Sequence, residues 1–461
     1  MNNNRSLTYI LILLHLFLVP LVYFKKGIIS VEVILVPLLV LAFMWEYKKG
    51  TIKLNSLPIM PFLITFGLYL IASSISLVNA EALKPGIMEI ARYLSYVVVF
   101  LIVVKVKFSK EQYINFAKVF GAAAIIIGLF GIFQYIFNFS LNKAGLYALQ
   151  EAKGRVDSTL VNPNYYSSFL NFVIPTFLLF AVVYFKDKKM QLVFFAFYAV
   201  FIVNLILTYT RAAWVTMACA FILIVLIMPK RFLKNFFKPH ILIAFAILFT
   251  GVYFMPDVQS RTASAIYAVE KLFFPNAEPP EVAEPEDPAA LDELTPEEIE
   301  EIKEKEQEKA ISETAVVSRT TLWKTGLVMY RDNPVLGVGM GNYYTRYKEF
   351  VTKYPELDIG HDAYSVHNSY IKVAAETGTV GILSFLSFYI VYFIYLIRLY
   401  FKQNDELGKV VAAGVCVGSI TFMVQNLSNN LIFIPQLNLI FWLVGGLAIA
   451  FLHLNQQRNF R

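Results

Sequence analysis

Two arginine side chains stand out by their position in the chain. Arg211 falls between two apolar runs with almost no room for a loop, and Arg319 lies in a long polar segment. A charge beside apolar chain is costly unless it is paired or reaches water, so Arg211 is a candidate functional residue. Its side chain can instead extend to lipid headgroups, and Arg319 can instead pair with nearby acidic residues. Because a guanidinium binds phosphate through two parallel hydrogen bonds, both arginines are candidate phosphate ligands.

A histidine supplies the matching candidate base. His367 begins the run His-Asn-Ser-Tyr in the same polar segment as Arg319. An imidazole of ordinary pKa, near 6.5, can accept a proton from a hydroxyl group. His361 lies in the same segment, whereas the other three histidines lie in or at the ends of apolar runs, where a structural role is expected: His15, His240 and His453.

A third polar motif precedes an apolar run. Asn162-Pro163-Asn164 predicts a turn, after which the Asn164 side chain is expected to cap the following helix. Capping alone accounts for the motif.

The elements that must position these residues are membrane helices. The chain has 461 residues, of which 57% are hydrophobic and 16% charged, and the apolar residues form runs of up to about 20 residues, enough to cross a membrane. The sequence therefore predicts an all-α polytopic membrane protein with about twelve transmembrane helices. They are expected near 7–24, 28–46, 57–78, 87–104, 115–138, 165–185, 190–208, 211–228, 240–256, 379–399, 408–425 and 431–453. The two cysteines, Cys219 and Cys416, lie inside apolar runs and are expected to be core residues.

Basic residues indicate the orientation. Lysine and arginine concentrate in alternate loops, which places both chain ends in the cytoplasm and the long loop after helix nine outside. This predicts a multi-pass membrane protein whose long loop lies in the periplasm or at the outer face of the cell. The expected divisions are 1–256 with helices one to nine, 257–378 as the extracytoplasmic loop, and 379–461 with helices ten to twelve.

The long loop has two parts of different character. Residues 275–313 are rich in Glu, Asp, Pro and Ala and predict a solvated insert, with a lid or a partner-docking arm as the alternative. The part at 318–378 predicts a helix that carries Arg319 and Trp323 and ends at Asn333. Glycines at 337, 339 and 341 then permit a close backbone approach. A second helix should begin near Asn368 or Ser369 and stop at Gly378.

Several other kinds of site have no matching pattern. The chain has no Walker loop, and its glycine cluster does not fit a dinucleotide-binding motif. It also lacks Asp-rich or Cys/His metal-ligand spacing and the interleaved basic and aromatic residues of nucleic-acid binding. We therefore expect no metal, cofactor or nucleic-acid partner.

Taken in order, these motifs resemble the O-antigen ligase and polymerase family of bacterial membrane proteins. The resemblance covers residues 155 to 385. It rests on Asn162-Pro163-Asn164, Thr210-Arg211, Ser318-Arg319 with Leu322-Trp323, Asn333-Pro334 with Gly337-Val-Gly-Met-Gly-Asn342, His367-Asn368-Ser369-Tyr370, and Glu376-Thr-Gly378-Thr-Val-Gly381. The insert at 275–313 is not part of the expected pattern.

The resemblance implies a metal-independent glycosyltransferase without a cofactor. Its donor would be a saccharide on undecaprenyl diphosphate, and its acceptor a lipid A core or a similar lipid-anchored glycan at the outer face of the membrane. By motif, Arg211 and Arg319 would hold the diphosphate, and His367 would be the base. Further substrate contacts are expected from Arg261, Asn368, Tyr370, Asn164 and Trp323.

Three alternatives stay open at this point. A polymerase of the same family would join lipid-linked repeat units instead of transferring them to another lipid. A transporter of the same glycan-lipid would be expected to show inverted repeats, of which the sequence gives no clear sign. A non-catalytic scaffold would use the acidic insert to recruit a partner.

Overall fold

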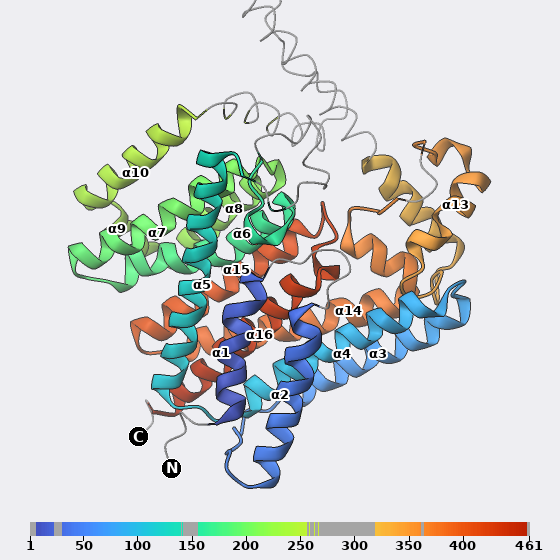
Figure 1. Ribbon diagram of the computed structural model, residues 1–461, viewed down its shortest axis with the longest axis horizontal. Helices are drawn as coiled ribbons and strands as arrows, with labels where there is room; N and C mark the ends of the chain where they lie inside the picture. Colours follow the sequence, from blue (N-terminus) through green and yellow to red (C-terminus); the bar gives the residue numbers. More distant parts are fainter. Residues whose placement is uncertain are drawn as a thin grey trace, which may run out of the picture.

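Figure 1 shows a computed structural model of the protein, drawn as a ribbon. It describes residues 6–22, 30–139, 141, 155–255, 258, 262, 266, 319–360 and 364–458. Within these ranges the regular secondary structure is helical, apart from one isolated bridge between Leu54 and Val106. The all-α prediction is confirmed for this part of the chain.

The helices follow one another along the whole chain. They are α1 (Leu7–Leu21), α2 (Val31–Lys48), α3 (Met60–Ser76), α4 (Leu83–Lys105), α5 (Lys110–Phe137), α6 (Pro163–Leu179) with a π-helical extension (Phe180–Tyr184), α7 (Lys188–Leu207), α8 (Arg211–Ile227), α9 (Pro229–Phe236), α10 (Pro239–Tyr253), α13 (Tyr343–Lys353), α14 (Ser369–Lys402), α15 (Glu406–Gln425) and α16 (Pro435–Arg458). A further helix is described over 319–332. Short 3₁₀ turns lie at Leu77–Asn79, Ser158–Leu160, Pro355–Leu357 and Leu431–Phe433.

Each of the twelve expected apolar segments contains a helix, but not every one is long enough to cross a membrane alone. Eight helices of the described chain meet the criteria of length and hydropathy for a membrane span. A ninth is reached if α8 and α9, which bend by 112°, form one broken span. Helices α1 and α10 have 15 residues each, roughly 23 Å at 1.5 Å per residue and short of the ~30 Å hydrocarbon core. The polytopic membrane class is thus confirmed, and the number of spans stays a prediction.

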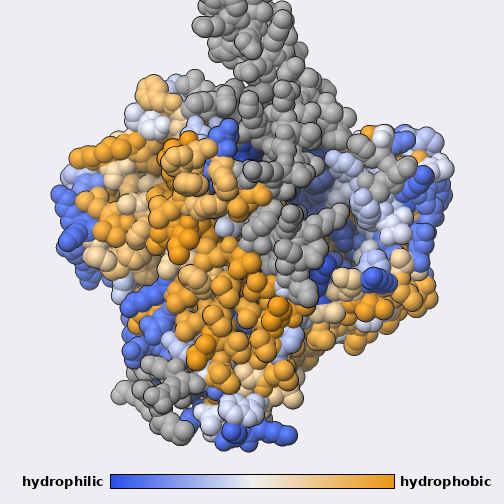
Figure 2. Space-filling view, in the orientation of Figure 1, coloured by the Kyte–Doolittle hydropathy of each residue, from blue (hydrophilic) through white to orange (hydrophobic). Residues whose placement is uncertain are grey.

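Three helices form the centre of the bundle. The apolar windows of α6, α15 and α16 are 83%, 72% and 89% buried, whereas those of α3, α5 and α7 are 33–39% buried. Aromatic side chains pack tightly at this centre, as in the contact of Trp442 with Tyr389, whose ring centroids are 5.2 Å apart. Figure 2 shows a broad hydrophobic surface over the visible face, as expected where helices face lipid.

The segment after the long insert packs as a small unit on the bundle. Its own core includes Leu322, Met329 and Tyr347 and is separate from the main one. It docks onto the start of α4 through Asn342, whose side chain accepts a hydrogen bond from the Ala82 amide nitrogen (2.8 Å) and donates one to the Ala82 carbonyl oxygen (2.9 Å). These paired bonds fix the segment against the membrane helices.

The second loop helix continues directly into a membrane helix, as predicted. Helix α14 begins at Ser369 with Asn368 as its cap, and its regular geometry breaks at Gly378, where φ is +67°. A Cβ atom at Gly378 would lie only 2.1 Å from the Val335 carbonyl oxygen. Glycine is therefore required here both by the left-handed backbone and by the close approach of another chain segment.

Replacing Gly378 with alanine is expected to destabilise the protein by about 3 kcal/mol, the sum of left-handed strain and overpacking. The matched control is Gly360→Ala, because Gly360 also has positive φ, +82°, but has no atom within 4 Å of the added Cβ. That control should cost about 1 kcal/mol. Thermal unfolding of the two purified variants measures the difference, and equal losses would contradict the packing argument.

Candidate functional site

His367 occupies a strained backbone position at the start of α14. Its φ is +51°, a left-handed conformation that is uncommon for a non-glycine residue and persists only when its surroundings impose it. The next residues supply that constraint. Asn368 accepts hydrogen bonds from the amides of the first turn and donates from Nδ2 to the Leu427 carbonyl oxygen (2.9 Å). Ser369 Oγ donates to Asn426 Oδ1 at 2.7 Å.

Arg319 and Tyr364 lie beside the His367 imidazole. The rings of Tyr364 and His367 have centroids 5.8 Å apart. Burial and, second, the neighbouring Arg319 cation lower the pKa of His367 to about 4. Burial also lowers the pKa of Arg319, an effect that Tyr364 opposes. At neutral pH the imidazole is therefore uncharged and able to accept a proton, next to an arginine that keeps its charge.

The face of the 319–332 helix that carries Arg319 is only partly covered. Arg319 and Trp323 are half-buried, and the Trp323 Nε1 atom is buried without a hydrogen-bond partner. Leu327, expected on the same face, is 50% exposed, whereas Leu322 and Met329 on the other side are buried in the small core. Among the described residues, the helix thus buries one face in the small core and has its Arg319 face only partly covered.

Arg211 belongs to a second group of polar residues. It is the first residue of α8 and is half-buried. The preceding turn is held by Arg155, which donates from Nε to the Thr208 carbonyl oxygen (2.9 Å) and from an Nη atom to Thr210 Oγ1 (3.2 Å). Thr210 Oγ1 donates in turn to Asn164 Oδ1 at 3.3 Å. The amino end of α8 adds a partial positive charge, which favours an anion here.

A chain of hydrogen bonds places the two groups at the same end of the bundle. Asn171 of α6 donates to the Ala213 carbonyl oxygen (3.0 Å), one turn or less from Arg211, and its own carbonyl oxygen accepts from Thr421 of α15 (2.9 Å). Two residues further along α15, the Met423 carbonyl oxygen accepts from the Tyr370 hydroxyl (2.7 Å). In Figure 1 this end of the molecule lies away from the amino end of α1 and the carboxyl end of α16.

The remaining predicted site residues divide into two sets. The polar atoms of Asn368 and Tyr370 bond to neighbouring backbone, which gives both residues a structural role, and their contact with substrate stays a prediction. Arg261, His361 and the insert at 275–313 lie outside the described residues.

The glycine cluster and the Asn-Pro-Asn motif have structural explanations. The amides of Val338 and Gly339 donate to the Ala375 and Glu376 carbonyl oxygens at 2.8 and 3.0 Å. The cluster permits close approaches to α14 at Gly337 and to Ala80 and the start of α4 at Gly339 and Gly341. The cap of α6 is Asn162, which accepts from the Asn164 amide, and the expectation that Asn164 is the cap is wrong. Pro163 fixes the first helical residue, so the residue before it takes the cap position.

One residue near the site was not singled out from the sequence. Arg155 contacts the turn that carries Arg211, although 56 positions separate the two in the chain. Its place shortly before the Asn162-Pro163-Asn164 motif was the sequence signal for it. The pairing depends on how α6 and α7 pack, which periodicity does not encode.

Comparison with known proteins gives one family match. Residues 195–386 match the family model described as O-antigen ligase. The matched segment runs from α7 into α14 and contains Arg211, Arg319 and His367. A comparison with curated proteins found no match. The match over residues 195–386 supports the O-antigen ligase family for this chain, a family that includes both ligases and polymerases.

Proposed function

We propose that this protein is a metal-independent, inverting glycosyltransferase of the cytoplasmic membrane. It transfers a saccharide from undecaprenyl diphosphate to a lipid A core or a similar glycan acceptor at the outer face. The observation that carries the proposal is the uncharged His367 imidazole beside the Arg319 cation, both inside the segment that matches the family.

The reaction needs one group that accepts a proton and positive groups that stabilise the negative charge developing on the leaving diphosphate. The acceptor hydroxyl oxygen attacks the anomeric carbon from the face opposite the diphosphate, and the bond from that carbon to the diphosphate oxygen breaks. The hydroxyl proton passes to the His367 imidazole. The electron pair leaves with undecaprenyl diphosphate, and the fixed guanidinium groups of Arg319 and Arg211 stabilise the charge that forms on it.

The pKa of His367 rises when the donor binds, which makes the imidazole a stronger base. In the protein without ligand, the Arg319 cation disfavours a second positive charge on the imidazole. A bound diphosphate brings negative charge next to Arg319 and offsets that repulsion, so the pKa of His367 rises and the imidazole becomes a stronger base. Donor binding thus prepares the residue for proton transfer.

The outward orientation is part of the proposal. The alternation of basic loops supports it, because lysine and arginine collect in the loops assigned to the cytoplasm. The polar groups of Arg211 and His367 lie at the opposite end of the bundle from α9, which is strongly basic. Polyprenyl diphosphate donors at the outer leaflet would then present their diphosphate at the level of these residues.

A transfer assay with labelled lipid-linked donor in membranes tests the proposal. Arg211→Ala should lower transfer by about 10²-fold, the usual effect of removing one preorganised donor to a developing charge. Arg231→Ala is the matched control, since Arg231 is exposed on α9, beyond the far end of α8. Full transfer by Arg211→Ala would reject its role in binding the diphosphate.

The same assay separates the two activities that the family includes. A labelled glycan on an added lipid acceptor identifies a ligase. A lengthened chain that is still on the polyprenyl carrier identifies a polymerase and would replace the acceptor proposed above.

A further inference from the structure

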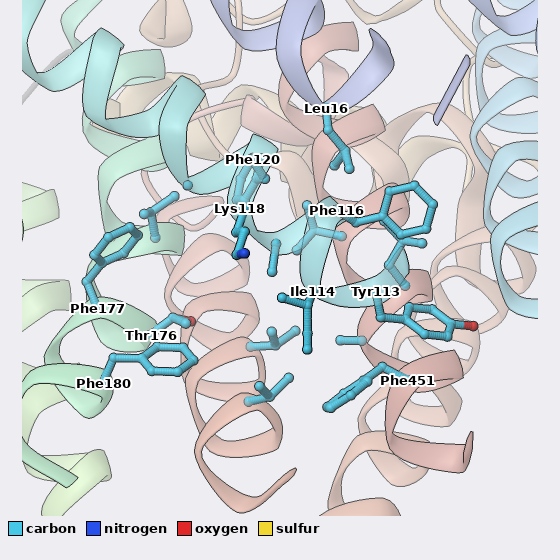
Figure 3. A pocket seen from close by; sticks show the side chains of 18 of the residues that line it. Leu16, Tyr113, Ile114, Phe116, Lys118, Phe120, Thr176, Phe177, Phe180 and Phe451 are labelled. Atoms are coloured by element: carbon cyan, nitrogen blue, oxygen red, sulfur yellow. The ribbon is translucent and has the colours of Figure 1, made fainter. Parts of the chain in front are cut away.

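A cavity lies inside the bundle, away from the residues discussed so far. It has a volume of about 540 Å³, within the range of roughly 300–1,000 Å³ that small-molecule sites occupy. Its walls come mostly from α5, α6, α15 and α16, with Leu16 of α1 and Phe194 and Phe197 of α7, and they are almost entirely aromatic and aliphatic (Figure 3). Ile114 and Ala122 are exposed as well as lining it, so the cavity opens to the surface of α5.

The cavity lies toward the end of the bundle opposite His367. Helix α15 runs from Glu406 to Gln425, and the cavity uses its first half through Leu407 and Val415. His367 is near the other end, where Ser369 bonds to Asn426. Helix α6 places the cavity away from the Arg211 group as well. Its cavity residues lie near its carboxyl end, whereas Asn164 of the Arg211 group is at its amino end.

One cation lines this apolar cavity. Lys118 is exposed, and Figure 3 shows its amine among the lining side chains. None of the described residues forms a salt bridge or a hydrogen bond with it. Another lysine at this end, Lys186, instead lies 3.8 Å from the Glu406 carboxylate. Lys118 therefore offers a positive charge that no acidic side chain of the described structure neutralises.

The position of Lys118 along α5 corresponds to a membrane boundary. Residues 119–137 contain no Asp, Glu, Lys or Arg, and as a helix they measure roughly 28 Å, close to the ~30 Å hydrocarbon core. The eight residues before Lys118 include Lys110, Glu111 and Asn115 and suit the headgroup region. The ammonium group thus lies at the depth of lipid phosphates, with the apolar cavity extending beside the hydrophobic part of the helix.

We propose that this cavity binds one anionic phospholipid from the leaflet at this end of the bundle. The lipid phosphate contacts the Lys118 ammonium, and an acyl chain occupies the space between α5 and the α6–α15 pair. Charge complementarity selects the anionic headgroup. The aromatic and aliphatic walls select a hydrocarbon chain. The bound lipid fills a space between helices that the side chains leave empty, so it stabilises the fold.

Titration of the purified full-length protein with phosphatidylglycerol or phosphatidylcholine of identical acyl chains tests the site. Retained lipid is counted by native mass spectrometry, and the unfolding temperature reports stabilisation by the bound lipid. The wild type should retain phosphatidylglycerol in preference to phosphatidylcholine. Lys118→Ala should lose roughly fivefold in affinity for phosphatidylglycerol, as expected for one lysine at a lipid surface. Its affinity for phosphatidylcholine should stay unchanged.

Two further variants separate the charge from the cavity. Lys110→Ala removes a lysine of the same helix that does not line the cavity, and should bind as the wild type does. Ala122→Trp fills the cavity from its open side and should weaken both phospholipids equally. The proposal is overturned if Lys118→Ala keeps the wild-type preference for phosphatidylglycerol. It is also overturned if undecaprenyl phosphate displaces phosphatidylglycerol at equal mole fraction, which would assign the cavity to a polyprenyl chain.

Discussion

Replacing His367 with alanine is expected to lower saccharide transfer by about 10²- to 10⁴-fold, the usual contribution of a general base. The imidazole is uncharged at neutral pH and is held at the start of α14 by a backbone that Asn368 and Ser369 anchor. Alanine at this position removes the proposed proton acceptor and leaves those anchoring bonds in place. Single-turnover transfer from labelled lipid-linked donor measures the loss.

The control for this variant is His240→Ala. His240 accepts or donates one hydrogen bond with Gln191 at 2.8 Å and lies at the amino end of α10, remote in the chain from α14. Its replacement should leave transfer near the wild-type rate. If His367→Ala transfers as fast as the wild type while both variants unfold at similar temperatures, His367 is not the base.

The pH dependence of transfer gives a second readout for His367. Only the uncharged imidazole accepts the proton, so the rate falls as the pH drops through the pKa of His367. Because that pKa is about 4 in the protein without ligand, kcat/KM should hold down to about pH 5, where a histidine with a pKa near 6.5 would be mostly protonated. The fall in kcat should begin at higher pH, since bound diphosphate raises the pKa of His367.

The helices could be predicted from the sequence wherever an apolar run had a local signal at its end. Asn368 and Gly378 bracket the first part of α14 as expected, because an asparagine cap and a left-handed glycine act within a few residues. The expected span at 431–453 begins late, since α16 starts at Pro435 after a 3₁₀ turn. The sequence predicts a basic loop where the structure has α9, because its eight residues are rich in lysine and arginine and form no apolar run.

The site was predictable by residue type but not by arrangement. A charge at the end of an apolar run made Arg211 a candidate, and the run His-Asn-Ser-Tyr made His367 one. The depressed pKa of His367 depends on its burial and on the cation of Arg319, 48 positions earlier in the chain, so a value near 6.5 was the only sequence-based expectation. The contacts of Arg155 with the α7–α8 turn could not be predicted from the sequence either, because they depend on tertiary packing.

Replacing Arg319 with glutamine is expected to lower transfer by about 10²- to 10³-fold, because it removes a fixed charge from the point where the leaving diphosphate gains negative charge. The structure provides a close control in Arg331, which lies in the same 319–332 helix. The Arg331 side chain is 63% exposed and pairs with Asp332 at 3.1 Å. Arg331→Gln should therefore transfer at close to the wild-type rate, since an exposed ion pair contributes little.

A structural role for Arg319 and a role in transfer predict different pH profiles. Removing the Arg319 cation relieves its repulsion of a protonated imidazole, so the pKa of His367 should rise in Arg319→Gln. The residual transfer should then decline with acid at a higher pH than in the wild type. Arg319→Lys keeps the charge but not the two parallel hydrogen bonds, so it should retain the wild-type pH profile with only partial recovery of rate. A loss of rate in Arg319→Gln without any change in its pH profile would place Arg319 away from the base and contradict the site.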